Sequence, residues 1–277
     1  MSGRAWSGRA GGARPFLAAL GMVLGGCGGE SEGTPEAEET PAATEEAAPS
    51  EAGAGSESGY RVVAVSNGGT IRGTVRFEGT VPPPERIAAS DDAETCGEYQ
   101  EVQPLRVAPG GGLADAVISI VDITEGASLE TPASPPTLDQ NGCRFSPHVL
   151  LVTAGEPVEI LNNDPIMHNV HTFTFDNRPV NRSQPPGVEK IEVEFAVPEK
   201  VRVRCDVHDW MSAWLIAVDH PYHAVTGDDG GFAIGNVPPG TYTLETWHES
   251  LGTSTRTVTV EPGGTAEVEM EMSRSES

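Results

Sequence analysis

The sequence predicts an all-β protein, and three observations lead to this fold class. Short segments that alternate apolar and polar residues recur after residue 60, as in Lys190–Phe195. Glycine and proline are abundant, with 33 and 23 residues, and they separate these segments as turn residues do. No segment has the 3.6-residue apolar period of a convincing amphipathic helix. The 277 residues are enough for one large or two small β domains beyond an N-terminal extension.

Residues 1–26 have the features of a secretory signal peptide. Three arginines and no acidic residue precede an apolar run at 15–24, which is too short to cross a bilayer. The signal ends in Leu-Gly-Gly-Cys27, which resembles a bacterial lipobox and implies that Cys27 is acylated and becomes the mature N-terminus. An ordinary cleaved signal with a chance cysteine is the alternative. We expect a lipid-anchored protein of the bacterial cell envelope, facing the periplasm or the cell exterior.

Residues 27–60 are expected to form a disordered acidic tether. Gly28–Gly59 contains nine glutamates, no lysine and no arginine, and is otherwise built of small and polar residues. Such a segment cannot bury enough apolar surface to fold. The formal net charge of the whole chain is −24, which argues against binding to nucleic acid or to anionic lipid headgroups. The acidity can attract a basic protein partner, or it can be an adaptation to high salt.

The candidate metal site centres on the stretch Val201–Met211. Val201, Val203 and Cys205 alternate with arginines, so they share one face of a strand and Cys205 points into the core. His208 and Met211 follow in a tight loop. A thiolate, an imidazole and a thioether at three-residue spacing are what a trigonal copper site with a weak axial sulfur needs. Such a site requires a second imidazole from elsewhere in the chain.

A second stretch, Val158–Val170, offers this imidazole, because a strand runs into a polar turn and His168-Asn169-Val170 follows. His-Asn-Val followed by Cys-x-x-His-x-x-Met resembles the cupredoxins, the small blue copper proteins, and the short loop is most similar to that of amicyanin. The resemblance implies one type 1 copper ion, with His168, Cys205, His208 and Met211 as ligands. It also implies that Asn169 ties the two ligand loops together, and that the ring edge of His208 is exposed and passes electrons to a partner.

Other interpretations of these residues stay open. Cys205 can be an ordinary small core residue, because Cys-x-x-His alone is a weak signal. His171 competes with His168 as the first imidazole, although the His-Asn pair favours His168. Zinc is the second metal to consider, but it prefers a fourth strong ligand to a thioether.

Cys96 and Cys143 remain after Cys27 and Cys205 are assigned. In an exported protein the compartment is oxidising, so we expect these two residues to form a disulfide. The alternative is that Cys143 and His148 form part of a second metal site, for which no further group of candidate ligands is visible in the sequence.

The C-terminal part has a different character. Thr226-Gly-Asp-Asp-Gly-Gly-Phe232 and Val237-Pro-Pro-Gly-Thr-Tyr242 indicate strands joined by tight turns. This pair resembles the carboxypeptidase regulatory-like domain, a transthyretin-type sandwich also grouped with carbohydrate-binding-like folds. The expected architecture is therefore a cupredoxin Greek-key β-sandwich packed with a transthyretin-like β-sandwich. We place the cupredoxin-like domain at 61–219, firm from 143, with a loop at 125–140. The second sandwich is placed at 220–277, with strands from 69–122 as candidates to complete it.

The favoured function is a membrane-anchored, extracytoplasmic blue copper protein that carries single electrons and is not an enzyme. The sequence has no His-x-His pair, no second cysteine in the ligand loop and no Cys-x-x-Cys-His haem motif. The expected partner is a basic redox protein such as a cytochrome, and no nucleic acid. One alternative is a copper-binding or copper-delivery lipoprotein without a redox partner. Another is an envelope binding module, for example for carbohydrate, in which the cupredoxin half is scaffold.

Overall fold

The computed structural model describes residues 59–89, 92–188 and 190–274. The predicted signal peptide at 1–26, the lipidation site Cys27 and nearly all of the tether at 27–60 lie outside the described residues. Within the described ranges, no helix is long and apolar enough to cross a membrane.

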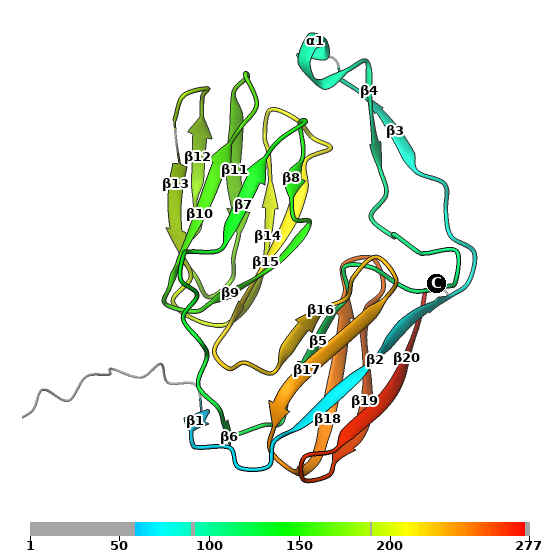
Figure 1. The fold of residues 1–277 in the computed structure, drawn as a ribbon. Coiled ribbons are helices and arrows are strands. Elements are labelled where there is room, and N and C mark those ends of the chain that lie inside the picture. The colour runs from blue at the N-terminus through cyan, green and yellow to red at the C-terminus, as the bar shows by residue number, and fades with distance from the viewer. Residues whose placement is uncertain (1–58, 90–91, 189, 275–277) are drawn as a thin grey trace, which may run out of the picture. The chain divides into compact units, whose positions relative to one another are not determined.

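Nearly all regular structure in the described residues is β-strand, which confirms the predicted fold class (Figure 1). The single helix of these residues, α1, spans Ala93–Cys96 and is one turn long. Most strands belong to two sandwiches, each built of two sheets with a separate apolar core.

The first sandwich joins a four-stranded and a five-stranded sheet. The four-stranded sheet has the order β13-β10-β7-β8, with β7 at Thr137–Gln140, β8 at Phe145–Ser146, β10 at Pro157–Asn162 and β13 at Lys190–Glu194. The five-stranded sheet has the order β12-β11-β14-β15-β9, with β9 at Val149–Thr153, β11 at His168–Phe173, β12 at Asn181–Gln184, β14 at Glu199–Arg204 and β15 at Ser212–Val218. Strand β14 turns Val201 and Val203 into the core and Lys200 and Arg202 outward, as the alternation predicts.

The second sandwich joins a four-stranded and a three-stranded sheet. The four-stranded sheet has the order β16-β5-β18-β19, with β5 at Val117–Ile120, β16 at His223–Val225, β18 at Gly240–His248 and β19 at Gly252–Val260. The three-stranded sheet has the order β17-β2-β20, with β2 at Gly69–Glu78, β17 at Gly231–Val237 and β20 at Thr265–Ser273. Ile71, Ile118 and Leu244 are fully buried in its core.

The first sandwich is inserted within the second one. Strands β2 and β5 precede the first sandwich in the chain but pair with strands that follow it. The strands of 69–122 therefore complete the C-terminal sandwich, and the described strands of the first sandwich begin at Thr137 instead of near residue 61. The physical reason is that β2 is hydrogen-bonded between β17 and β20 and turns its apolar face into the second core, a pairing that strand alternation alone does not specify. Strand β7 also lies inside the region 125–140, which was expected to be a loop.

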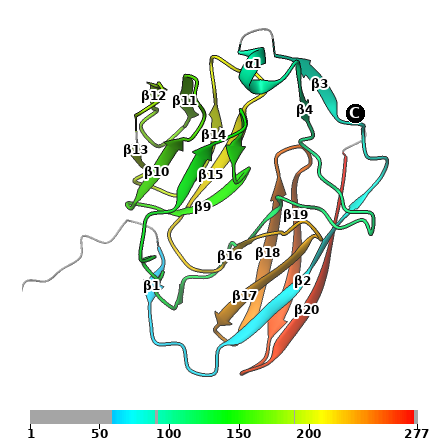
Figure 2. The ribbon, with the colours of Figure 1, turned by 45° about the horizontal axis from the view of Figure 1, so that its top comes forward.

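Two short strand pairs lie outside these sheets. Strand β1 at Arg61–Val62 pairs with β6 at Glu125–Gly126. Strand β3 at Glu85–Ala88 pairs with β4 at Tyr99–Val102, and α1 lies between them in the chain (Figures 1 and 2). Ala89 and Cys96 are buried in the core of the first sandwich, so this hairpin packs on that sandwich. We call the described residues of 85–102 the cover segment.

The predicted disulfide is present, because Cys96 of the cover segment is bonded to Cys143 of the first sandwich. This bond links the end of α1 to the turn between β7 and β8. The cover segment is therefore held by a covalent bond as well as by apolar contacts.

Apolar and charged residues join the two sandwiches. Val117 of β5 clusters with Val149, Ile216 and Val218 of the first sandwich. At one end of this cluster Trp214 Nε1 donates a 2.7 Å hydrogen bond to Glu249 Oε2, and His148 Nε2 bonds to the other oxygen of Glu249. Burial by itself lowers the pKa of His148, but the hydrogen bond and charge of Glu249 outweigh it and raise that pKa. Burial by itself raises the pKa of Glu249, but His148 outweighs it and lowers that pKa.

These shifts predict a pH-dependent contribution of Glu249 to stability. The pKa of His148 in the folded protein lies above its ordinary 6.5, so its contribution is fully present below pH 6.5 and is lost as the pH rises through the raised pKa. The pKa of Glu249 lies below its ordinary 4.5, so its contribution is present above pH 4.5 and is lost on acidification. We expect Glu249→Gln to lower the free energy of unfolding by about 1.5–3 kcal/mol at pH 5.5 and by less at pH 8.5.

Chemical denaturation followed by tryptophan fluorescence at the two pH values measures this difference. The matched control is Glu245→Gln, which removes the same charge from a surface pair with Lys200. This control should cost about 1 kcal/mol or less, equally at both pH values. An equal loss at both pH values for Glu249→Gln would contradict the prediction.

Candidate metal centre

Three candidate metal ligands lie at one end of the first sandwich, namely His168, Cys205 and His208. His168 is the first residue of β11, and Cys205 directly follows the last residue of β14. The loop after Cys205 is closed by two backbone hydrogen bonds, from Cys205 N to Met211 O at 3.2 Å and from Met211 N to His208 O at 3.0 Å. Because this loop is short and hydrogen-bonded at both ends, Cys205 and His208 are held on adjacent sides of one small space.

The ligand atoms of His168, Cys205 and His208 converge. The Nδ1 atoms of the two imidazoles are 3.0 Å apart, and Cys205 Sγ is 3.7 Å from His208 Nδ1. All three donor atoms lie within 4.8 Å of one another, and the three residues are at most 2 % exposed. Two imidazole nitrogens and a thiol sulfur that face one buried point are a donor set suited to copper, and they also suit zinc.

The fourth candidate ligand, Met211, is also in this core. Its side chain is 1 % exposed and belongs to the same apolar cluster as Cys205 and Trp210. A thioether is a weak ligand that suits a copper ion better than zinc. The structure therefore places Met211 in the same core as Cys205, and its ligand role stays a prediction.

Asn169 connects the two ligand loops. Its backbone N–H points at Cys205 Sγ at 3.3 Å, and its side-chain Oδ1 accepts a 3.0 Å hydrogen bond from Asp206 N. Its Nδ2 donates to Asn181 Oδ1 at 2.6 Å. This residue lies where the sequence resemblance expects a link between the loops, and its N–H can stabilise negative charge on the sulfur.

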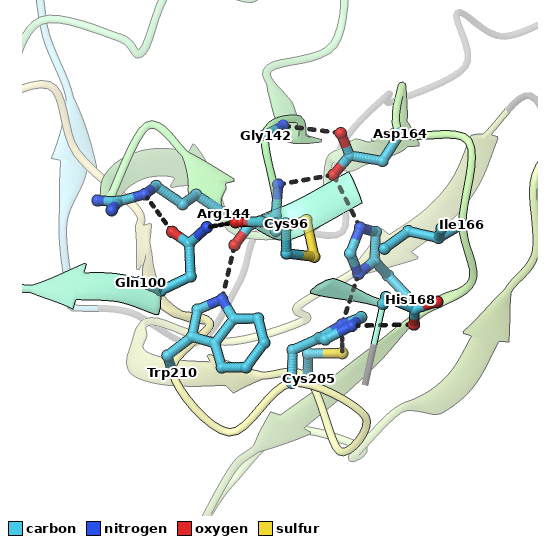
Figure 3. The surroundings of a disulfide bond; sticks show 12 residues. Cys96, Gln100, Gly142, Arg144, Asp164, Ile166, His168, Cys205 and Trp210 are labelled. Atoms are coloured by element: carbon cyan, nitrogen blue, oxygen red, sulfur yellow. Dashed lines mark hydrogen bonds and ion pairs between the residues drawn. A yellow bond between two sulfur atoms is a disulfide. The ribbon is translucent and has the colours of Figure 1, made fainter. Parts of the chain in front are cut away.

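Asp164 is a further residue of the site, and sequence reasoning did not find it. Its Oδ2 lies 2.8 Å from His168 Nε2, and its two oxygens accept hydrogen bonds of 2.8 Å from the backbone N–H groups of Gly142 and Cys143 (Figure 3). A carboxylate on the distal nitrogen holds an imidazole in the orientation that leaves the other nitrogen free for a metal. The available signal was an aspartate in the polar turn four residues before His168.

Burial changes the protonation of two of the candidate ligands. Burial lowers the pKa of His168, and this effect outweighs the neighbouring Asp164, so the neutral ring that a metal requires is favoured. Burial raises the pKa of the Cys205 thiol, so the metal-free protein favours the protonated thiol, and a bound metal ion would have to displace this proton.

The residues of the alternative assignments do not join the converging donor atoms of His168, Cys205 and His208. His171 is directed at the carboxylate of Asp206, with Nδ1 2.9 Å from Oδ1, and its ring stacks on Phe173. Cys143 lies close to Asp164 and His168, but its sulfur is used in the disulfide. His148 bonds to Glu249 and to the carbonyl of Ser212, so it does not form a second metal site with Cys143.

The expectation that the edge of His208 is exposed is wrong. Its side chain has no exposed surface. Asp92 of the cover segment lies 3.4 Å from Nε2, and the ring of Trp210 lies beside the imidazole with centroids 5.0 Å apart. The cover segment is more than 100 residues away in sequence, so the loop motif around His208 carries no sign of it.

One sequence family matches the chain. The model of the carboxypeptidase regulatory-like domain matches residues 214–273, which include β16 to β20. This agrees with the resemblance seen at Thr226–Phe232 and Val237–Tyr242. No curated protein matches the chain.

Cupredoxins are among the solved structures similar to this chain. A copper-containing nitrite reductase from Thermus scotoductus is 20% identical, with a TM-score of 0.29, covering 33% of this chain and 25% of that one. The chain thus spans a quarter of that enzyme's length. A purple cupredoxin from Nitrosopumilus maritimus is 17% identical, with a TM-score of 0.26, over 30% of this chain and 99% of that one. Amicyanin from Paracoccus versutus is 17% identical, with a TM-score of 0.27, over 36% of this chain and 97% of that one. The chain is thus similar to the carboxypeptidase regulatory-like domain over residues 214–273, and cupredoxins are among its structural neighbours.

Proposed function

We propose that this protein is a membrane-anchored, extracytoplasmic carrier of single electrons that holds one type 1 copper ion. The observation that carries the proposal is the convergence of His168 Nδ1, His208 Nδ1 and Cys205 Sγ on one buried point. Met211 would supply the weak axial sulfur. The signal-like residues 1–26 and Cys27 support the lipid anchor and export.

Copper would supply a one-electron couple between Cu(I) and Cu(II). The residues would hold it in one arrangement for both states, because His168 is fixed by Asp164 and Cys205 by the N–H of Asn169. Burial keeps water away from the ligands and so limits the rearrangement that would accompany a change of charge. Sulfur ligands favour Cu(I) and imidazoles favour Cu(II), so this mixed set favours neither state strongly.

The proposed partner is a basic redox protein such as a cytochrome. The chain carries a formal charge of −24, and Asp206 lies within the ligand loop, directly after Cys205. Attraction between opposite charges raises the rate of association and weakens with salt.

Copper titration of the soluble part of the protein tests the metal assignment. We expect binding of one equivalent and an intense visible band from charge transfer between the Cys205 thiolate and Cu(II). Stopped-flow mixing with a basic cytochrome tests the carrier role, and the rate should fall as salt rises. Copper binding without any electron exchange would favour the copper-delivery alternative, whereas the buried site under a covalently attached segment favours retention of the ion.

Replacing Met211 by leucine should retain copper and raise the reduction potential. Leucine has a similar volume but no sulfur, and loss of a weak axial donor favours Cu(I). Voltammetry of the copper-loaded proteins measures the change. An unchanged potential, or complete loss of copper, would show that Met211 is not an axial ligand.

A further inference from the structure

The distal nitrogen of His208 is buried without a hydrogen bond. Nε2 is inaccessible to solvent, and within the described residues no protein atom forms a hydrogen bond with it. An unpaired buried donor costs roughly 1–3 kcal/mol, so such groups are usually matched with an acceptor. The group nearest to filling this role is the carboxylate of Asp92, with Oδ2 3.4 Å from Nε2. This distance is within ion-pair range but slightly long for a hydrogen bond.

Asp92 is attached to the first sandwich through α1, because its carbonyl accepts hydrogen bonds from Thr95 N and Cys96 N. Asp92 directly precedes α1, and its backbone has a left-handed conformation with φ of 57°. Four residues later the helix ends at Cys96, which is bonded to Cys143. Gln100 of the cover segment bonds to the carbonyl of Cys96 and accepts a 3.2 Å hydrogen bond from Arg144 Nε (Figure 3).

Arg144 also donates to the carbonyl of Glu101 at 2.9 Å. These contacts fix the C-terminal end of α1 and strand β4 on the first sandwich. Asp92 is therefore carried to His208 by a segment that is attached close to the metal-ligand candidates, and not by a free loop.

From this arrangement we propose that Asp92 is a positioning residue for the copper ligand His208, in the way that Asp164 is for His168. The inference rests on the proposed copper function and adds to it a residue outside the ligand loops. A carboxylate on Nε2–H orients the ring so that Nδ1 faces the metal, and its negative charge favours the more highly charged Cu(II) state. The cover segment thus both seals the edge of His208 and lowers the reduction potential of the site.

The expected effect of Asp92→Asn is a higher reduction potential. Loss of a group that holds a metal-bound imidazole typically changes metal affinity 10–100-fold. Because the Asp92 side chain is 39% exposed, we expect the low end, about a tenfold fall in the Cu(II) to Cu(I) affinity ratio. A tenfold change corresponds to about 59 mV for a one-electron couple.

The experiment compares three variants of the exported protein without its lipid anchor. Asp92→Asn removes the charge, Asp92→Glu restores it, and Glu94→Gln removes an equal charge from an exposed position in α1, which Asp92 directly precedes. Voltammetry and the electron paramagnetic resonance spectrum of the copper-loaded proteins are recorded at one pH and one salt concentration. We expect a raised potential and an altered spectrum for Asp92→Asn, partial return for Asp92→Glu, and values near wild type for Glu94→Gln.

A potential and a spectrum that are the same in Asp92→Asn and Glu94→Gln would overturn the inference while leaving the copper function intact. If the wild-type protein binds no copper, the proposed function fails. The contact between Asp92 and His208 is then tested in the metal-free proteins by the NMR resonances of the His208 ring nitrogens. A change of these resonances in Asp92→Asn that is absent in Glu94→Gln would support the contact, and the same resonances in both variants would refute it.

Discussion

Replacing Cys205 by serine will abolish the visible absorption band of the copper-loaded protein. The band requires a thiolate bonded to Cu(II). In the described residues Cys205 is the free cysteine, and its buried Sγ lies 3.7 Å from His208 Nδ1. Serine is close in size and its oxygen can accept the hydrogen bond from Asn169 N, so the fold should persist. We expect loss of essentially all absorbance and a copper affinity at least ten-fold weaker.

Absorption spectra and a copper titration of the purified variant measure both effects, with circular dichroism as a check on the fold. The control is His171→Gln, which removes the rival imidazole outside the converging group. This control should keep the band. A serine variant that keeps the band would end the copper assignment, and loss of the band in His171→Gln would show that the first imidazole was misassigned.

Removing the disulfide will destabilise the protein and expose His208. Cys96 and Cys143 are 47 residues apart in sequence, and closing a loop of this length is worth about 4 kcal/mol in the chain-entropy model. The bond also attaches the cover segment beside the buried ring of His208. We therefore expect the double variant Cys96→Ala/Cys143→Ala to lose about this amount of unfolding free energy and to admit solvent to His208.

Denaturant unfolding measures the first effect, and the reactivity of His208 toward a histidine-modifying reagent, read by mass spectrometry, measures the second. Reductant should reproduce both changes in the wild-type protein and should leave the double variant unchanged. This comparison distinguishes the effect of the disulfide bond from the effect of losing the packing of the two side chains. Unaltered stability and reactivity in reduced wild-type protein would contradict this account of the cover segment.

Local pattern was sufficient to predict many of the longer strands and to place Cys205, His208 and Met211 in one candidate metal loop. Alternation in β14 predicts that Cys205 faces the core, because successive side chains of a strand point to opposite sides. The spacing of His208 and Met211 after Cys205 restricts all three to one loop. Turn residues around Asp229 and Pro238 are local in the same way, so the strands of the C-terminal sandwich could be expected from them.

Only the tertiary structure decided which distant segments meet at the site and in the sheets. Alternation identifies β2 and β5 as strands but does not name their neighbours, so their membership of the second sandwich depended on pairing across the inserted sandwich. Asp92 lies 116 residues before His208 in sequence and reaches it through the cover segment. That long-range contact adds to the burial of His208 by Trp210, because a loop motif specifies which atoms can bind a metal but not which distant segment of the chain covers them.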